Sequence, residues 1–517
     1  MTAWRDHSVS VPRLLQPLLA VAVSCALAAA SWAADGEARL ESVKVTTSGS
    51  VDTSSYESIV RDLCKPGMSS ETKAIALFDW FERSTYHRIT NPDVNWNPHK
   101  VINVYGGITC GTQGSTMAGL CRLAGLEARV VSTSDGSHTF YEVKYDGSWH
   151  GFDTMDRLWV YTRGEPKQVA SHQALKDDPT LATKAVEEGR ACPGFLFHGD
   201  KAEWFTTGIK VLGYTPTFIQ GLEQLNLTPG QKVTWYWYNT NKIHPDLMTG
   251  NPGKLGGMIH SCSRRADARN PLSFPFWEPY YYLTPGCHPE QQERRMYGNG
   301  VLAFEPDLTG KAITPGFSQV TNLAGPGLVP VAADKPGSAT YLLHSPWLLV
   351  GGKLTLKVAP GASLDTIKVE LTKNGKDFQP AKAALSPQGE LELTSALVPA
   401  WSYDFGFRLT LPDARAALAG VRLELDFMHN KYVAPFLVPG NNTVKFTTSN
   451  PATLANFPAT IEYAWQEGPD WDKAEVKTNV HVASSTAACE WPIQIGGTRN
   501  PRMKSLSVSV GVTARAK

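Results

Sequence analysis

Three residues whose side chains can carry out nucleophilic catalysis, Cys110, His138 and Asp153, follow one another in the first third of the chain. A cysteine thiolate can attack a carbonyl carbon, a histidine can exchange the proton, and a carboxylate can orient the histidine ring. Gly107 and Gly111 flank the cysteine and leave room for a substrate backbone to come close. The pattern therefore predicts thiol acyl transfer, with Cys110 as the nucleophile.

A helix is expected directly behind Cys110. Apolar residues recur at helical spacing over 111–124, and Gly125 stands where a left-handed residue often ends a helix. A thiol at a helix start meets unpaired backbone N–H groups and the positive end of the helix dipole, which both favour the thiolate. The N–H of Gly111 is a candidate for stabilising an oxyanion. The alternative is an inert buried cysteine, which the glycine-rich approach and the helix start disfavour.

A hairpin is expected to bring His138 and Asp153 together. The Asp-Gly pair at 146–147 predicts a two-residue turn between strands at 138–145 and 148–153. In the register set by this turn, Asp153 lies diagonal to His138 on one face, about 7 Å away at the backbone. Asp153 can then accept a hydrogen bond from one imidazole nitrogen and leave the other facing the thiol.

Glu142 lies on the same strand face as His138 in this register. Charged residues are mostly exposed, so we expect Glu142 to be solvated rather than catalytic. For His138 alone a packing role would be the default, but the position of Asp153 in the register favours catalysis.

Four motifs in this part of the chain resemble those of transglutaminase-like proteins. Residues 107–129, from Gly-Ile-Thr-Cys-Gly to Gly-Leu-Glu-Ala-Arg, resemble a nucleophile helix that ends in a Leu-x-x-x-Gly-Ile-Pro-Ala-Arg-like segment. His-Thr-Phe-Tyr-Glu-Val at 138–143 resembles the His-Ala-Trp-x-Glu-Val strand of the family. Residues 146–149 and 153–154 resemble its Asp-Gly-x-Trp and Asp-Pro-Thr. The resemblance covers about 71–162 and points to an exported bacterial type.

The resemblance implies a papain-like α+β fold in which Cys110 is the nucleophile, His138 the base and Asp153 the orienting acid. The family also has an upstream Trp that stabilises the oxyanion, and Trp96 and Tyr105 are the candidates for that position here.

This chain departs from the family motifs at three positions. Thr139 and Phe140 replace the common Ala and Trp, and Thr154 stands where Pro is usual. None of these changes removes a triad group, so they bear on the shape of the substrate rather than on the fold.

The rest of the chain predicts antiparallel β structure. Repeated apolar and polar alternation after 338 is typical of half-buried strands, most simply a β-sandwich. The sequence predicts five segments: a signal peptide at 1–33, a transglutaminase-like catalytic domain at 34–194, a β-rich domain at 195–309, a linker at 310–337, and a β-sandwich region of one or two domains at 338–517. The fold class is thus α+β, with a papain-like core followed by antiparallel β-sandwich domains.

The N-terminus predicts export. Arg5 and Arg13 precede an apolar run at 14–30, and Ser31-Trp32-Ala33 offers small residues at a cleavage site. The protein is therefore expected in the periplasm or outside the cell, with the alternative that the segment stays as a membrane anchor. No later stretch approaches the roughly 18 apolar residues of a membrane span. The formal net charge of +1 gives no indication of a basic surface that would bind nucleic acid.

The chain has eight cysteines, and an exported protein is expected to meet an oxidising compartment in which disulfides form. Without Cys25, in the predicted signal peptide, seven remain, so at least one thiol is unpaired, and Cys110 has the setting of a reactive one. Cys262 with Cys287 is the expected disulfide. Cys64 with Cys192 and a core position for Cys121 are further expectations.

We expect no metal and no cofactor, because the sequence has neither paired ligand spacing nor a phosphate-binding glycine loop. The predicted substrate is a protein or peptide amide, with an amide of a glycoconjugate or of cell-wall material left open. Hydrolysis is favoured over cross-linking because it needs fewer special features. The alternative from another class is a non-catalytic scaffold that binds polysaccharide or protein through aromatic residues such as Trp235, Trp237, Trp277 and Tyr280, although packing roles are favoured for them.

Overall fold

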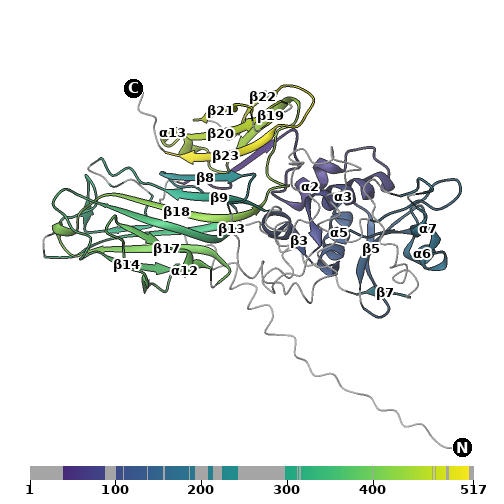
Figure 1. The fold of residues 1–517 in the computed structure, drawn as a ribbon, viewed down its shortest axis with the longest axis horizontal. Helices are drawn as coiled ribbons and strands as arrows, with labels where there is room; N and C mark the ends of the chain where they lie inside the picture. The colour runs from purple at the N-terminus through teal and green to yellow at the C-terminus, as the bar shows by residue number, and fades with distance from the viewer. Residues whose placement is uncertain are drawn as a thin grey trace, which may run out of the picture.

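The computed structural model describes residues 39–87, 100–108, 110–136, 138–154, 158–185, 187–191, 208–213, 224–240, 242, 297–310, 313, 316–332, 334–398, 400–468, 470–471, 473–484 and 488–511. A unit of helices around a small sheet adjoins a larger region of stacked antiparallel strands (Figure 1). The predicted signal peptide lies outside the described residues. Within them, no helix is both long enough and apolar enough to cross a membrane.

Three α-helices and one π-helical turn build the helical side of the first unit. They are α2 (Tyr56–Leu63), α3 (Ser70–Ser84), the π-helical turn η3 (Val101–Tyr105) and α5 (Cys110–Leu123). The hydroxyl of Ser69 caps α3 by accepting a hydrogen bond from the N–H of Thr72. Gly125, at φ +82°, follows α5 in the left-handed conformation, which confirms the predicted end of the nucleophile helix.

A four-stranded antiparallel sheet forms the other side of this unit. Its order is β6 (Ser148–Phe152), β5 (Thr139–Tyr145), β4 (Glu127–Thr133) and β7 (Ile209–Leu212). Asp146 and Gly147 both have positive φ, as a two-residue primed turn requires. Tyr145 pairs with Ser148 and Tyr141 with Phe152, so the predicted hairpin register is confirmed.

Short elements complete the first unit. They are the parallel pair β2 (Tyr86–His87) and β3 (Gly107–Ile108), and the helices α6 (His172–Asp177) and α7 (Thr180–Thr183). Tyr86 pairs with Gly107, so the chain leaving α3 runs beside the chain that enters α5.

A twelve-stranded sheet dominates the β region. Its main path runs β15-β14-β17-β13-β18-β9-β8-β23-β20-β21, with β10 and β16 paired to β13. The strands are β8 (Gln231–Tyr236), β9 (Tyr297–Phe304), β10 (Gln319–Thr321), β13 (Gly337–Val358), β14 (Lys368–Thr372), β15 (Gln379–Pro380), β16 (Glu390–Glu392), β17 (Ser402–Leu411), β18 (Leu418–Asn430), β20 (Ala459–Gln466), β21 (Val476–Ala483) and β23 (Arg502–Val510).

A three-stranded sheet of order β1-β19-β22 accompanies the large sheet. The remaining elements are β1 (Lys44–Thr47), β11 (Leu323–Ala324), β12 (Val329–Pro330), α12 (Thr394–Leu397), the 3₁₀ turn η5 (Ala414–Ala416), β19 (Gly440–Thr447), α13 (Ala452–Asn456) and β22 (Ala488–Ile495). The rings of His481, from β21, and Trp491, from β22, stack with centroids 4.1 Å apart, so the two sheets touch here.

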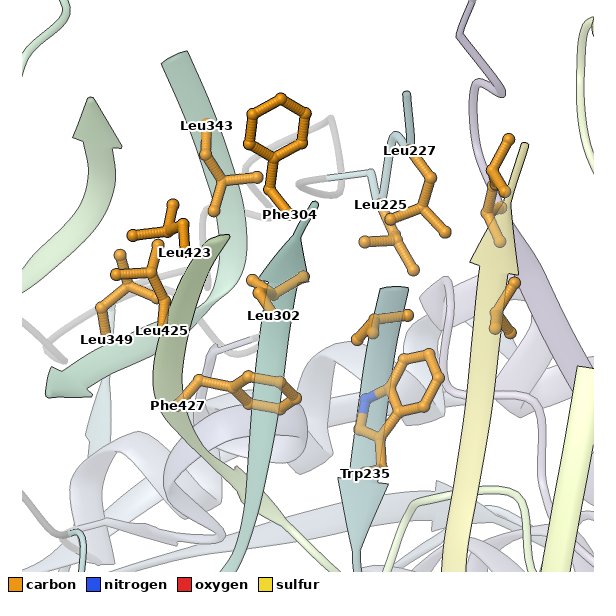
Figure 2. Close-up of a cluster of buried hydrophobic side chains, with 14 of the residues drawn as sticks. Leu225, Leu227, Trp235, Leu302, Phe304, Leu343, Leu349, Leu423, Leu425 and Phe427 are labelled. Atoms are coloured by element: carbon orange, nitrogen blue, oxygen red, sulfur yellow. The ribbon is translucent and has the colours of Figure 1, made fainter. Parts of the chain in front are cut away.

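The β core is drawn from strands that are far apart in the sequence. Figure 2 shows Trp235 of β8, Leu302 of β9 and Phe427 of β18 as neighbours in one buried apolar cluster. Phe304 stacks on Tyr341 of β13, with ring centroids 4.2 Å apart. These contacts join the strands before residue 310 to those after residue 337.

Sheet pairing crosses the segments expected from the sequence. β8 and β9 lie between β18 and β23 in one sheet, although the sequence suggested separate regions at 195–309 and 338–517. β10 lies within the predicted linker at 310–337 and pairs with β13. β1, from the start of the predicted catalytic segment, pairs with β19. The boundaries themselves stay predictions.

Candidate active site

Cys110 is the first residue of α5 and is half-buried. Helix α5 is buried from Thr112 to Cys121, because it packs between α3 on one side and β4 and β5 on the other. The first N–H groups of a helix have no partner within the helix. The sulfur therefore lies at the positive end of a helix that is enclosed by protein, as the sequence predicted for this position.

The imidazole ring of His138 meets the carboxylate of Asp153 inside the protein. Nε2 of His138 lies 2.6 Å from Oδ2 of Asp153, and both side chains are only 2% exposed. This short hydrogen bond assigns Nε2–H as the donor and leaves Nδ1 as the second nitrogen of the ring. The hairpin register therefore brings these two predicted residues together as expected.

The backbone on each side of this contact is held in place. The N–H of His138 donates to Oγ1 of Thr133 at 3.1 Å, and its carbonyl accepts from the hydroxyl of Ser132 at 2.6 Å. Asp153 exchanges two backbone hydrogen bonds with Leu158, of 2.9 Å and 2.8 Å. Both partners of this hydrogen bond are thus held through their main chain.

A glycine lets the nucleophile helix approach the histidine strand. A Cβ placed on Gly114 would lie 3.0 Å from the carbonyl oxygen of Phe140, which is tighter than ordinary contact. Gly114 is one turn beyond Cys110, and Phe140 is two residues beyond His138. One residue before Gly114, Oε1 of Gln113 accepts a hydrogen bond from Thr154, next to Asp153, at 3.1 Å. These contacts tie α5 to both strands of the hairpin.

Glu142 is buried rather than solvated, so that expectation was wrong. Its side chain is 1% exposed, and Oε2 accepts hydrogen bonds from Nε and Nη2 of Arg129 at 2.8 Å and 2.6 Å. Oε1 accepts from the backbone N–H of His172 at 3.3 Å. Burial disfavours the charged carboxylate, but His172 and Arg129 outweigh burial and lower the pKa of Glu142 to about 2. The guanidinium that permits this burial comes from the neighbouring strand β4, which alternation cannot reveal.

An aromatic stack connects this buried charge to the histidine strand. The ring of His172 stacks on Phe140 with centroids 3.7 Å apart, and Phe140 lies 5.4 Å from the ring of His138. A Cβ on Gly151 would lie 2.7 Å from Nδ1 of His172, so only glycine leaves room for this ring. Phe140, which replaces the family's common Trp, is therefore packed from both sides.

The oxyanion candidates have different places. Gly111 is the second residue of α5, and its carbonyl accepts a hydrogen bond from the hydroxyl of Ser115 at 2.8 Å. Tyr105 ends the π-helical turn η3 and is fully buried, with its hydroxyl in contact with that of Tyr403 from β17. Trp96 lies outside the described residues. All three stay predictions as oxyanion or substrate contacts.

The β region hydrogen-bonds to the chain segment that leads to Cys110. Nδ2 of Asn430, the last residue of β18, donates to the carbonyls of Ser84 and Ile102, each at 2.7 Å. Gly106, with φ +60°, passes so close that its Cβ would lie 2.9 Å from Cγ of Asn430.

Other residues singled out in the sequence serve the core or are not described. Cys121 is fully buried, as expected, and burial raises the pKa of its thiol. Trp235 and Trp237 are also buried, which matches the packing roles favoured for them. Cys192, Cys262, Cys287, Trp277 and Tyr280 lie outside the described residues, so both disulfide pairings stay predictions. In the described part of the chain, no three His, Cys, Asp or Glu side chains cluster as a metal site.

Several residues of this site were not found from the sequence. Leu158 acts through its backbone, for which residue type gives no signal, and the hydroxyl of Thr133 contacts His138 only because the turn between them folds back. His172 could have been suspected only from its place after the hairpin. Asn430 is more than 300 positions from Cys110, and nothing near it in the sequence points to the site.

Comparisons with solved structures add little. A glycoside hydrolase family 2 member from Bacteroides cellulosilyticus is 7% identical over 34% of this chain, with a TM-score of 0.12, and only 22% of that enzyme is covered. A second family 2 structure from the same organism has 26% of its length covered. The pilus backbone protein RrgB of Streptococcus pneumoniae is 10% identical over 37% of this chain and 81% of its own, with a TM-score of 0.10. Likeness at this level carries no argument, and no curated protein matches the chain.

The comparison with family models is informative. The model of the transglutaminase-like superfamily matches residues 57–154. This range begins in α2 and ends just after Asp153, so it contains α3, α5 and the hairpin β5-β6. The chain therefore carries a domain of the transglutaminase-like superfamily at residues 57–154.

Proposed function

We propose that this protein is a thiol acyl-transfer enzyme that acts on amide bonds through Cys110, His138 and Asp153. The observation that carries the proposal is the 2.6 Å contact between His138 and Asp153 in a buried hairpin, against which the helix that begins at Cys110 is packed. A buried carboxylate beside a histidine favours the imidazolium, and a helix start favours the thiolate. Together they stabilise the charged pair that such an enzyme needs.

The reaction follows from these three groups. The thiolate of Cys110 adds to the amide carbonyl carbon, and the resulting oxyanion is stabilised by N–H groups at the start of α5. His138 gives its proton to the departing amine, and the C–N bond breaks to leave a thioester. An incoming water or amine then loses a proton to His138 as it attacks the thioester, which restores the thiolate. Asp153 keeps the ring oriented throughout.

Hydrolysis is our first choice for the second step and transfer to an amine the second. The substrate class is a protein or peptide amide, and amides of glycoconjugates or of cell-wall material belong to the same proposal. The site is expected to work outside the cytoplasm, in the periplasm or beyond, and to need no cofactor.

Alkylation of the purified full chain with iodoacetamide near neutral pH, followed by peptide mapping, tests the proposal. We expect selective labelling of Cys110 that falls sharply in His138→Ala. The matched control is His150→Ala, which removes another buried histidine of the same hairpin, whose ring bonds the carbonyls of Val169 and Tyr145. Slow and equal labelling of every accessible thiol, unchanged in His138→Ala, would refute the proposed enzymatic function.

A second assay separates the two outcomes of the thioester. Both routes release the original amine, so formation of the free carboxylate from a peptide amide is compared with incorporation of a labelled primary amine into the same peptide. Incorporation that exceeds carboxylate formation would replace the hydrolase with a cross-linking enzyme.

The rival from another class is a non-catalytic scaffold of the cell envelope. The burial of Trp235 and Trp237 removes two of the aromatic residues suggested for it. Retention of the chain on cell-wall polysaccharide, together with a Cys110 thiol that is not selectively alkylated, would favour this rival.

A further inference from the structure

We infer that Asn430, in the β region, is a positioning residue for the nucleophile, so that the acyl site is completed by a side chain from outside the transglutaminase-like domain. The inference rests on the proposed function, because it concerns the reactivity of Cys110. Asn430 lies well beyond residues 57–154, the segment matched to the family.

The side chain of Asn430 is fully engaged. It is 1% exposed, and Nδ2 donates to the carbonyls of Ser84 and Ile102 at 2.7 Å. Oδ1 accepts from the N–H of Tyr432 at 3.1 Å. This set of partners fixes which amide atom is nitrogen and which is oxygen. A buried amide with all of its partners in place costs free energy to disturb.

The two carbonyls mark the entries to one short parallel pair of strands. Ser84 is the last residue of α3 and leads into β2, while Ile102 belongs to η3, which leads into β3. Since β3 ends at Ile108, Cys110 follows only two residues later. Asn430 therefore joins the segment that leads into β2 to the segment that leads into β3. Of these two strands, β3 directly precedes the nucleophile.

Gly106 lies directly against the side chain of Asn430, between η3 and β3. It has φ +60°, its N–H donates to the carbonyl of Val101 at 2.7 Å, and its missing Cβ would lie 2.9 Å from Cγ of Asn430. The backbone at the end of η3 therefore packs directly against the side-chain amide of Asn430, which only glycine permits at this position. A π-helical turn is rare and is frequently found at functional sites.

Aromatic contacts hold the same turn against the β region. The hydroxyls of Tyr105 and Tyr403 touch, the ring of Tyr105 lies 5.8 Å from that of Trp401, and Nζ of Lys100 lies 3.4 Å above the ring of Tyr403. The turn is therefore anchored at both ends and in the middle, and Gly106, which lies against Asn430, is the anchored residue nearest to Cys110 along the chain.

The test measures the rate of iodoacetamide alkylation of Cys110 as a function of pH in the full chain. In Asn430→Asp, a carboxylate would face two carbonyl oxygens and repel them. We expect the rate at neutral pH to fall about tenfold or more, since a displacement of about 1 Å is enough for such losses. The pH midpoint should rise, because a displaced thiol loses its place at the helix start.

The matched control is Asn442→Asp in β19. Asn442 is also fully buried, donates from Nδ2 to the carbonyl of Val438 at 2.7 Å, and accepts from the N–H of Val438 at 2.9 Å. It belongs to the three-stranded sheet and has no such link to the turn before Cys110. We expect this variant to lose thermal stability as Asn430→Asp does, but to keep the wild-type alkylation profile.

Gly106→Ala provides a second variant that reaches the same contact from the other side. Its control is Gly125→Ala, which has a similar backbone conformation at φ +82° and open space around it. We expect Gly106→Ala to lower the rate, Gly125→Ala not to, and the loss in the double variant Gly106→Ala with Asn430→Asp to be smaller than the product of the two single losses.

The outcomes separate two kinds of failure. If Cys110 of the wild-type chain shows no selective alkylation, the proposed function fails. If the wild type is selective and Asn430→Asp and Gly106→Ala keep its rate and pH midpoint, or if Asn442→Asp changes them as much, the positioning role fails and the proposed function stands.

Discussion

The contact between His138 and Asp153 lies in a setting where water does not screen it, with both side chains 2% exposed. A carboxylate in that setting can hold a histidine ring in one orientation and favour its protonated form. Its role in the proposed reaction can be removed without removing its shape, because asparagine has nearly the same outline.

We expect Asp153→Asn to lower the alkylation rate of Cys110 near neutral pH by about a hundredfold or more, since the amide cannot stabilise the imidazolium. The measurement is the pH dependence of labelling. Asp146→Asn is the control, because it removes a carboxylate from the same hairpin and leaves an Asn-Gly turn, which suits this geometry. Equal rates in the two variants would contradict the role of Asp153.

Glu142 sets an acid limit on stability. Its pKa is lowered from 4.5 to about 2 in the folded state. The stabilisation is therefore complete above pH 4.5 and is lost as pH falls from 4.5 to about 2, with a full value on the order of 3 kcal/mol.

We expect Glu142→Gln to lower the free energy of unfolding at pH 6, because Arg129 loses its buried partner, and to weaken the loss of stability between pH 4.5 and pH 2. Urea unfolding at pH 6 and pH 3 measures both effects. Glu127→Gln, whose side chain is exposed and pairs with Lys144, is the control and should match the wild type. An unchanged acid slope in Glu142→Gln would overturn this account.

At the level of secondary-structure elements, the site depends on how closely α5 lies on β5. Glycine in a helix is normally replaced by alanine with a gain of about 1 kcal/mol. At Gly114 the added Cβ would lie 3.0 Å from the carbonyl of Phe140, and strand backbone has little freedom to move.

We therefore expect Gly114→Ala to destabilise the fold by about 1–3 kcal/mol and to slow the labelling of Cys110. Thermal unfolding and peptide mapping measure the two effects. Gly420→Ala is the control, because its Cβ would lie 3.6 Å from the nearest side-chain atom, that of Lys357. A stabilised Gly114→Ala variant would mean that α5 has room to spare over β5.

The elements of the site could be predicted because their signals are local. The helix behind Cys110 follows from a 3.6-residue period and Gly125, and the hairpin register follows from two residues, Asp146 and Gly147. Glu142 could not be predicted correctly, because its burial depends on Arg129 from a neighbouring strand. Asn430 could not be predicted at all, since a single amide at the end of a strand carries no trace of the turn it binds.

In the whole molecule, strand order is the property that the sequence does not reveal. Alternation identifies β18 and β23 as strands, but it does not say that β9 and β8 lie between them. The described β region therefore depends on strands from both sides of the predicted linker.

We expect a fragment of residues 338–517 not to fold cooperatively, because β18 would lack β9 and β23 would lack β8. Thermal unfolding followed by circular dichroism, compared with the full chain, measures this. Adding the segment 195–337 in trans should restore part of the transition. A sharp transition in the isolated fragment would show that the later strands close a sheet by themselves.

The order of these strands also has a consequence during synthesis. Cys110, His138 and Asp153 emerge from the ribosome early, but Asn430 follows 277 residues after Asp153, and its strand needs β9 and β13 as neighbours. If Asn430 positions the nucleophile, a chain whose translation stops before that point contains all three proposed catalytic residues and still lacks a fully reactive thiol. The topology would then act as a completeness check, in which only the finished polypeptide gains its chemical activity.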